Sequence, residues 1–207
     1  MSQHWAPKSA FYFLRHGETD WNRAGKLQGA TDIPLNGLGV QQAARAAAIL
    51  KSLPISRVLM SHLIRVRQTA APLLDGWTLS PEINPGLAER RYGVWEGKTH
   101  AETDGSGAPE GGETRRAFND RVIGTLSAIT PTPAHEPGLL IIAHSGVFRA
   151  IAEALEIELE RGIGNAEPVR IECGAQGRWR FVHLAIDADT APDAKQPSAK
   201  FADLNPV

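Results

Sequence analysis

Arginine, histidine and glycine stand together at Arg15-His16-Gly17, directly after the apolar run Phe11-Tyr12-Phe13-Leu14. Such a run is typical of a buried strand, so the polar triplet is expected at the strand's carboxyl end. A neutral histidine can attack phosphorus, and arginine offers a planar fork of donors that suits phosphoryl oxygens. From residue types alone, the triplet makes an anion-binding site possible, with His16 as a candidate to take a phosphoryl group onto its ring.

A second histidine, His144, follows the apolar run 139–143 in the same way. Ligands bind at the carboxyl ends of the strands of an open α/β sheet, so His16 and His144 are expected to lie side by side. A charged His144 would stabilise the oxygens of the transition state, and Arg65 would add a second guanidinium. Glu89, within a long loop, could protonate the leaving group. From residue types alone, these roles remain open.

Apolar runs and segments of helical periodicity alternate along the chain. The runs predict strands at 11–14, 58–60, 77–79, 139–143, 169–173 and 179–184, and the periodic segments predict helices over 37–51, 63–74, 113–129 and 147–155. This alternation favours an α/β fold, a three-layer α/β/α sandwich with a mostly parallel central sheet. The two purest apolar runs, 11–14 and 139–143, are expected to be central strands.

Two of the predicted helices have specific expectations. Asn36 should cap the first helix, because its side chain can accept from a free backbone N–H. The residues expected to face the core are Ala43, Ala44, Ala47 and Leu50 in this helix, and Ala70, Ala71 and Leu74 in the next. Pro72 weakens the prediction for the second half of that helix.

Length and composition limit the class of protein. The chain has 207 residues, of which 42% are hydrophobic and 22% charged, as in ordinary globular domains. We expect a single domain with its core over about 10–186, a Gly- and Pro-rich irregular region at 81–112 and a loose tail at 187–207. The net charge of -1 argues against nucleic acid or an anionic membrane as a partner.

The single cysteine, Cys173, excludes an internal disulfide and suits a reducing compartment. We interpret Cys173 as a small core or edge residue. The sequence contains neither an apolar segment of signal-peptide length near its start nor a run long enough to span a membrane. A cytoplasmic location is the resulting expectation. No metal-ligand spacing is present, so no metal is expected.

Five segments resemble, in order, the sequence blocks of the histidine phosphatase superfamily, also called the phosphoglycerate mutase-like family. They are Leu14-Arg15-His16-Gly17-Glu18-Thr19 with Trp21-Asn22; Asp32-Ile33-Pro34-Leu35-Asn36 with Gly39 and Gln42-Ala43; Ser61-His62-Leu63-Ile64-Arg65 with Gln68-Thr69-Ala70; Leu87-Ala88-Glu89 with Gly93 and Trp95-Glu96-Gly97; and Ala143-His144-Ser145-Gly146-Val147-Phe148-Arg149. Two positions depart from the usual pattern: Asn36 stands where Thr or Ser is commoner, and Ser145-Gly146 where Gly-Gly is usual. One block alone is a weak signal, but five in family order make a specific one.

The resemblance implies roles for matching positions. His16 would be the phosphorylated nucleophile, Glu89 the proton donor, and Arg15, Arg65 and His144 the positively charged pocket. Asn22, Gln28 and the backbone at Gly29 would line the phosphate side, and Gly17 would let backbone N–H groups approach the anion. The His16 ring should be neutral beside Arg15, with its tautomer fixed by a backbone carbonyl such as that of Gly17. The resemblance also implies that the protein works without a metal, and that it would use a cofactor, 2,3-bisphosphoglycerate, only if it were a mutase.

Two reactions share this machinery. A phosphatase lets water attack the phosphohistidine, whereas a phosphoglycerate mutase returns the phosphoryl group to another hydroxyl with 2,3-bisphosphoglycerate as its cofactor. The short, Gly-rich stretch between Glu89 and His144 favours the phosphatase branch. Arg90 and Tyr92 resemble the mutase block, in which such residues hold a substrate carboxylate, and Arg115-Arg116 could contact further anions. We predict a phosphatase of a small phosphorylated metabolite, with the mutase and a non-catalytic phosphate-binding protein as alternatives and a homodimer left open.

Overall fold

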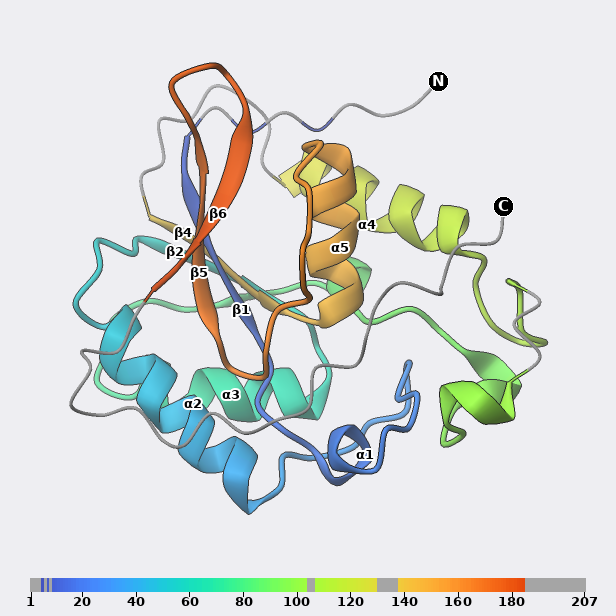
Figure 1. Ribbon diagram of the computed structural model, residues 1–207. Helices are drawn as coiled ribbons and strands as arrows, with labels where there is room; N and C mark the ends of the chain where they lie inside the picture. Colours follow the sequence, from blue (N-terminus) through green and yellow to red (C-terminus); the bar gives the residue numbers. More distant parts are fainter. Residues whose placement is uncertain (1–4, 6, 8, 104–106, 130–137, 185–207) are drawn as a thin grey trace.

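A six-stranded sheet forms the centre of the computed structural model, which describes residues 5, 7, 9–103, 107–129 and 138–184 (Figure 1). The strands are β1 (Phe11–Arg15), β2 (Arg57–Met60), β3 (Glu82–Ile83), β4 (Leu139–Ala143), β5 (Pro168–Cys173) and β6 (Trp179–His183). Their order across the sheet is β3-β2-β4-β1-β5-β6. The strands β3, β2, β4 and β1 pair in parallel, whereas β5 is antiparallel to β1 and β6 is antiparallel to β5. The mostly parallel sheet is therefore confirmed, with β4 and β1 at its centre.

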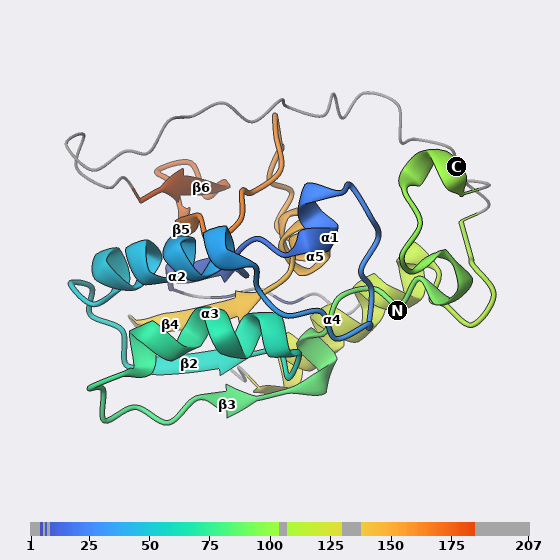
Figure 2. The ribbon, with the colours of Figure 1, turned by 90° about the horizontal axis from the view of Figure 1, so that it is seen from below.

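Two pairs of helices cover the sheet, one on each face (Figure 2). The helices α2 (Gly37–Leu50) and α3 (Ile64–Leu74) lie on one face, and α4 (Arg115–Ile129) and α5 (Ser145–Ala154) lie on the other. The short helix α1 (Asp20–Arg23) and three 3-10 turns, at Pro85–Leu87, Gly93–Trp95 and His100–Glu102, lie in the connections. The predicted three-layer α/β/α sandwich is therefore confirmed.

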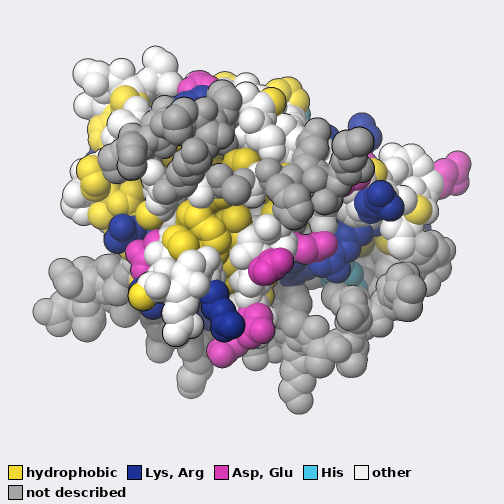
Figure 3. All heavy atoms as spheres, turned by 90° about the horizontal axis from the view of Figure 1, so that it is seen from above, with side chains coloured by type: hydrophobic (Ala, Val, Ile, Leu, Met, Phe, Trp, Pro, Cys, Tyr) yellow, Lys and Arg dark blue, Asp and Glu magenta, His cyan; other side chains and the backbone are white. Residues whose placement is uncertain are grey.

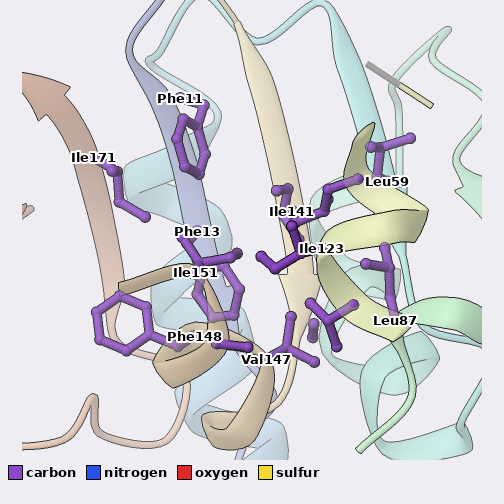
Figure 4. Packing of buried hydrophobic residues seen from close by; sticks show 14 of the residues in the cluster. Phe11, Phe13, Leu59, Leu87, Ile123, Ile141, Val147, Phe148, Ile151 and Ile171 are labelled. Carbon is purple, nitrogen blue, oxygen red and sulfur yellow. The ribbon is translucent and has the colours of Figure 1, made fainter. Parts of the chain in front are cut away.

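The central strands are buried on both faces because their side chains alternate between two apolar clusters. Phe11 and Phe13 of β1 point to the side of α4 and α5, where Phe13 packs on Phe148 with 5.3 Å between ring centroids (Figure 4). Tyr12 and Leu14 point to the side of α2 and α3. A strand buried on both faces needs apolar side chains at every position, so the apolar runs 11–14 and 139–143 predicted central strands.

The four predicted helices are confirmed to within two residues at each end, but two residues predicted to face the core do not. Asn36 caps α2 as expected, its Oδ1 accepting from the N–H of Gly39 at 2.8 Å. Ala44 is exposed, and Ala46 takes the buried place instead, because in a run of alanines the sequence pattern does not distinguish the faces. Ala71 is likewise exposed, since α3 turns Leu73 and Val66 toward the sheet. Leu74 is half-buried, and Pro72 is accommodated inside the helix.

The third predicted strand, at 77–79, is wrong. Trp77 and Leu79 contribute half-buried side chains to the apolar cluster without pairing to the sheet, so their apolar character reflects packing and not pairing. The edge position is taken by β3, whose Glu82 pairs with Leu59 of β2. Cys173, at the end of β5, is an exposed free thiol. The predicted tail and part of the Gly-rich loop, 105–106, lie outside the described residues.

The surface carries charges of both signs. On the face shown in Figure 3, Lys and Arg side chains lie next to Asp and Glu side chains, with apolar side chains between such groups. Salt bridges such as Arg115–Glu153 and Arg161–Glu167 account for part of this pairing. Within the described part of the chain, none of the helices has the length and apolar character that crossing a membrane requires.

Candidate active site

The carboxyl ends of β1, β2 and β4 bring distant segments to one edge of the sheet. Arg15 is paired with Ala143 in the β1–β4 register, and the N–H of His16 donates to the Ala143 carbonyl at 3.0 Å. The rings of His16 and His144, the residues that follow these strands, have centroids 5.3 Å apart. The expectation that the two histidines lie side by side is confirmed.

The His16 ring is held in one tautomer. Its Nδ1 lies 2.8 Å from the Gly17 carbonyl, which can only accept, so Nδ1 carries the proton and the lone pair is on Nε2. The residue is only 3% exposed. Burial, followed by the positive charges of Arg15 and Arg65, lowers the pKa of His16 well below its ordinary value of 6.5. The ring is therefore neutral at physiological pH, as expected for an attacking nitrogen.

The second ring, His144, is buried in the same way as His16. It is completely buried, and its Nε2 lies 2.9 Å from Oγ of Ser61. Burial lowers the pKa of His144 well below 6.5, and Arg65 and His16 lower it further. This shift favours the neutral ring, and the charged ring that bound phosphate would favour stays a prediction. Its Nδ1 is buried without a hydrogen-bond partner in the described part of the chain.

These two buried rings are expected to make folding less favourable as the solution is acidified. Their pKa values lie below that of an unfolded histidine, so below pH 6.5 the unfolded chain takes up protons that the native rings do not. The stabilisation is fully present above about pH 6.5. It should fall by about 1.4 kcal/mol per ring between about pH 7.5 and about pH 5.5.

Urea titrations of the wild type and of His144→Gln at these two pH values test this linkage. The variant should lose less stability on acidification, by about the contribution of one ring. An equal loss in both proteins would show that His144 is not a buried neutral group.

The two guanidinium groups reach the site from different elements. Arg15, at the end of β1, donates through Nη1 to the Ile163 carbonyl at 2.8 Å. Arg65, in the first turn of α3, is fully buried and donates to the carbonyls of Thr31 (2.8 Å) and Gly29 (2.7 Å). Burial lowers the pKa of Arg15 to about 10 and lowers that of Arg65 also, so both remain charged. The Nε atoms of both are buried, and no described residue accepts from them.

The carboxylate of Glu89 lies against the start of α5. Its Oε2 accepts from the N–H of Gly146 at 3.1 Å, and its Oε1 from the N–H of Arg90 at 2.8 Å. A helix N-terminus presents free N–H groups that favour such a carboxylate. Close approach is possible only because residue 146 is glycine, since a Cβ there would lie 2.0 Å from Oε1 of Glu89.

Substitution of Gly146 by alanine is therefore expected to displace the Glu89 carboxylate. The new methyl group would also lie 3.1 Å from the Phe118 ring, so there is little room for it to relax. Turnover of an alkyl phosphate should fall by about 10²-fold, the lower end of what a general acid contributes. Steady-state kinetics alongside Gly37→Ala, a helix-start glycine with open space around it, provide the matched comparison. Wild-type turnover in Gly146→Ala would contradict this account of the glycine.

Asn22 reaches His16 through a third residue. Its Oδ1 accepts from the N–H of Thr19 (3.1 Å) and from Nδ2 of Asn165 (3.2 Å). Asn165 also donates to the His16 carbonyl at 3.1 Å, and the N–H of Ala166 lies 3.1 Å from the Arg15 carbonyl. The segment before β5 therefore holds the backbone of the Arg15-His16 pair.

Gln28 and Gly29 lie on the loop that binds Arg65. Gln28 is 7% exposed, and its Oε1 is buried without a partner among the described residues. Gly29 has a φ of 54°, a conformation that favours glycine, and it contributes a carbonyl to Arg65. The Glu96 carboxylate fixes this loop by accepting from the N–H groups of Ala30 (3.0 Å) and Thr31 (2.9 Å).

Arg90 and Tyr92 lie beside Glu89 and contact each other, with the guanidinium 5.2 Å from the ring centroid. Arg90 also donates to the carbonyls of Glu113 (2.8 Å) and Gly107 (2.5 Å), so it ties two loop segments together. Burial and the negative charge of Glu89 raise the pKa of Tyr92 to about 12, so its phenol stays protonated.

Several residues that build the site were not singled out from the sequence. Ser61 contacts His144, Thr69 accepts from the N–H of Gly17 at 2.9 Å, and Asn165 binds the His16 backbone. Ser61 and Thr69 stand within the third block, whereas no sequence signal marked Asn165. The N–H of Gly17 itself donates to Thr69, and the expectation that Gly17 lets backbone N–H groups approach an anion stays a prediction. Glycine is needed there because a Cβ would lie 2.5 Å from the Gly39 carbonyl.

Comparisons with known proteins were made for sequence and structure. The family model "Histidine phosphatase superfamily (branch 1)" matches residues 11–187. The adenosylcobalamin/alpha-ribazole phosphatase of Salmonella typhimurium is 34% identical over 84% of this chain and 89% of its own. A protein of Cronobacter sakazakii named probable phosphoglycerate mutase GpmB is 32% identical over 63% of this chain and 67% of its own.

A solved structure of mycobacterial glucosyl-3-phosphoglycerate phosphatase in complex with VO3 superposes with a TM-score of 0.69. It is 29% identical and covers 84% of this chain and 97% of its own. No group of three or more potential metal ligands occurs among residues that the structure describes. The family model spans most of the chain, and the predicted family is confirmed: the chain belongs to the histidine phosphatase superfamily, branch 1, and is a phosphatase of that family.

Proposed function

We propose that the protein hydrolyses the phosphomonoester of a small metabolite through a phosphohistidine on His16. One observation carries this proposal. Nε of Arg15, Nε of Arg65 and Nδ1 of His144 are buried beside His16 without partners in the described part of the chain. Buried polar groups are normally paired, so several such nitrogens around a neutral imidazole support a phosphoryl group as the missing partner.

In the first step, the lone pair on Nε2 of His16 attacks phosphorus and the bond to the leaving oxygen breaks. Arg15 and Arg65 neutralise the phosphoryl oxygens, and the Ser61 hydroxyl donates to Nε2 of His144 so that Nδ1–H faces the anion. Where the bound anion favours protonation of this ring, Nε2 also carries a proton and Oγ of Ser61 accepts from it. Glu89 donates its proton to the leaving alkoxide, and the free alcohol departs.

In the second step, water attacks the phosphohistidine. The Glu89 carboxylate, now deprotonated, takes a proton from that water, the P–N bond breaks, and neutral His16 and inorganic phosphate are released. Asn22 and Gln28 contact the phosphate oxygens, with the backbone at Gly29 beside them. Protein groups supply the nucleophile, the acid and the positive charge, so we propose a metal-independent reaction. The single cysteine supports a cytoplasmic location.

The mutase is the second candidate, favoured by the name of the Cronobacter relative and by the position of Arg90 and Tyr92. Nε and Nη2 of Arg90 already donate to backbone carbonyls, so this guanidinium has fewer donors left for the substrate carboxylate that a mutase would hold. This supports the hydrolase. The names of the phosphatase relatives suggest two substrates for a metabolite panel, an alpha-ribazole phosphate and glucosyl-3-phosphoglycerate.

The experiment compares phosphate release with isomerisation. The protein is incubated with the panel, with 4-nitrophenyl phosphate and with 3-phosphoglycerate, with and without 2,3-bisphosphoglycerate, and each with and without EDTA. Phosphate release without bisphosphate that is insensitive to EDTA is expected. Isomerisation of 3-phosphoglycerate that depends on bisphosphate would establish the mutase, and no turnover by the folded protein would favour a binding protein.

A further inference from the structure

An ion pair of a buried carboxylate and a partly exposed guanidinium lies outside the phosphate pocket, next to the segment that carries Glu89. Glu113 is 6% exposed, and Arg121 of α4 binds it with two hydrogen bonds, Nε to Oε1 and Nη2 to Oε2, both 2.9 Å. The guanidinium also lies 5.1 Å from the centroid of the Phe118 ring. Neither member of the pair has a role in the chemistry described above.

The remaining hydrogen bonds of this pair go to the backbone around Glu89. Arg121 donates through Nη1 to the carbonyls of Gly86 (2.8 Å) and Ala88 (3.3 Å), and through Nη2 to that of Glu89 itself (3.3 Å). On the other side of Glu89, Oε2 of Glu113 accepts from the N–H of Arg91 at 3.0 Å. The ion pair therefore holds the chain before, at and after the proton donor.

The start of α5 fixes the carboxylate end of the Glu89 side chain. Since its Oε2 receives the N–H of Gly146, the side chain spans between α5 and the backbone that Arg121 holds. A general acid must lie within hydrogen-bond reach of the leaving oxygen, and a displacement of about 1 Å can cost about 10²-fold in rate. The backbone position of Glu89 is therefore as important as the carboxylate.

We propose that Glu113 and Arg121 are positioning residues for the proton donor Glu89, and this inference rests on the proposed function. A partly buried ion pair of this kind contributes little net stability, so stability alone does not account for it. Its hydrogen bonds to carbonyls and an N–H flanking Glu89 specify where the carboxyl group stands during proton transfer. Loss of the pair should therefore resemble a partial loss of the acid.

The test uses two substrates that differ only in their need for an acid. An alkyl phosphate requires protonation of its leaving oxygen, whereas 4-nitrophenolate leaves without it. For Arg121→Gln and Glu113→Gln, kcat/KM is expected to fall about 10- to 100-fold on the alkyl phosphate and less than about 3-fold on 4-nitrophenyl phosphate. Arg121→Lys keeps the charge but not the fork of donors, so its kcat/KM on the alkyl phosphate should lie between the values of these variants and of the wild type.

Arg57→Gln is the matched control. Arg57 likewise binds a carboxylate, that of Glu82, through two nitrogens and a carbonyl, that of Ile129, but it lies at the amino end of β2. This variant should lose stability without changing the ratio of the two kcat/KM values. If Arg121→Gln does not fold, Glu113→Gln and Arg121→Lys, checked by circular dichroism and thermal melting, give the same comparison.

The double variant Glu89→Gln/Arg121→Gln completes the experiment. Once the acid is removed, loss of its positioning residue should produce no further selective loss on the alkyl phosphate. Equal losses on both substrates, or no loss in a folded Arg121→Gln protein, would overturn the positioning role alone. Failure of the proposed function is separate, because the wild type would then hydrolyse neither substrate.

Discussion

His16→Ala is expected to abolish hydrolysis, with kcat falling by about 10⁴-fold or more, as when a covalent nucleophile is removed from an enzyme. The substitution removes Nε2, whose lone pair is available because the Gly17 carbonyl accepts the hydrogen bond from Nδ1–H. Measurement of phosphate release from 4-nitrophenyl phosphate tests this directly. Rapid acid and base quenches of the wild type should also trap a phosphorylated protein that is stable in base and labile in acid.

Binding of inorganic phosphate distinguishes this result from unfolding. Arg15, Arg65 and His144 remain in His16→Ala, so isothermal titration should still detect phosphate. A folded His16→Ala protein with turnover within about 10-fold of the wild type would mean that another group is phosphorylated, or none.

Glu89→Gln is expected to separate substrates by their leaving groups. Glutamine has nearly the size of glutamate but no acidic proton, and its single oxygen can keep only one of the two hydrogen bonds from Gly146 and Arg90. For an alkyl phosphate, kcat/KM should fall by about 10²- to 10⁴-fold, whereas 4-nitrophenyl phosphate should change by less than about 10-fold. The ratio kcat/KM is the appropriate quantity because it ends at transfer to His16, before Glu89 acts on water.

Glu172→Gln provides the control, because the Glu172 carboxylate on β5 binds Arg180 at the surface. This substitution should change kcat/KM for neither substrate. Equal losses on the two substrates in Glu89→Gln would remove Glu89 as the acid and leave it a structural carboxylate.

Much of this fold could be predicted because the decisive signals are local. The runs 11–14 and 139–143 are apolar at every position, as strands buried on both faces must be, and each is followed by a polar residue at its carboxyl end. The juxtaposition of His16 and His144 follows from that alone. The cap at Asn36 was equally predictable, since it depends on a side chain three residues from its partner.

The features that were missed depend on contacts between distant segments. Asn165 binds the His16 backbone across the sheet, and nothing in its neighbourhood distinguishes it from a turn asparagine. Gly17 was expected to let backbone N–H groups approach an anion, and the sequence did not reveal that the close approach of Gly39, in another element, also requires a glycine there. The strand at 77–79 was wrong because apolar character reports burial and not backbone pairing, and the two-residue strand β3 is too short to leave a periodic signal.

The position of β4 has a consequence for how the active site comes into being. β4 lies between β1 and β2 and pairs with both, although residues 61–138 are synthesised between β2 and β4. A nascent chain that ends before residue 139 lacks the strand that joins β1 to the β2–β3 pair, and it has neither His144 nor the helix start that holds Glu89. We therefore expect folding to be slow and dominated by long-range pairing, and an amino-terminal fragment to remain unfolded and prone to aggregate. Catalytic competence should therefore appear late, only after the ribosome has released β4, the strand that joins β1 to β2.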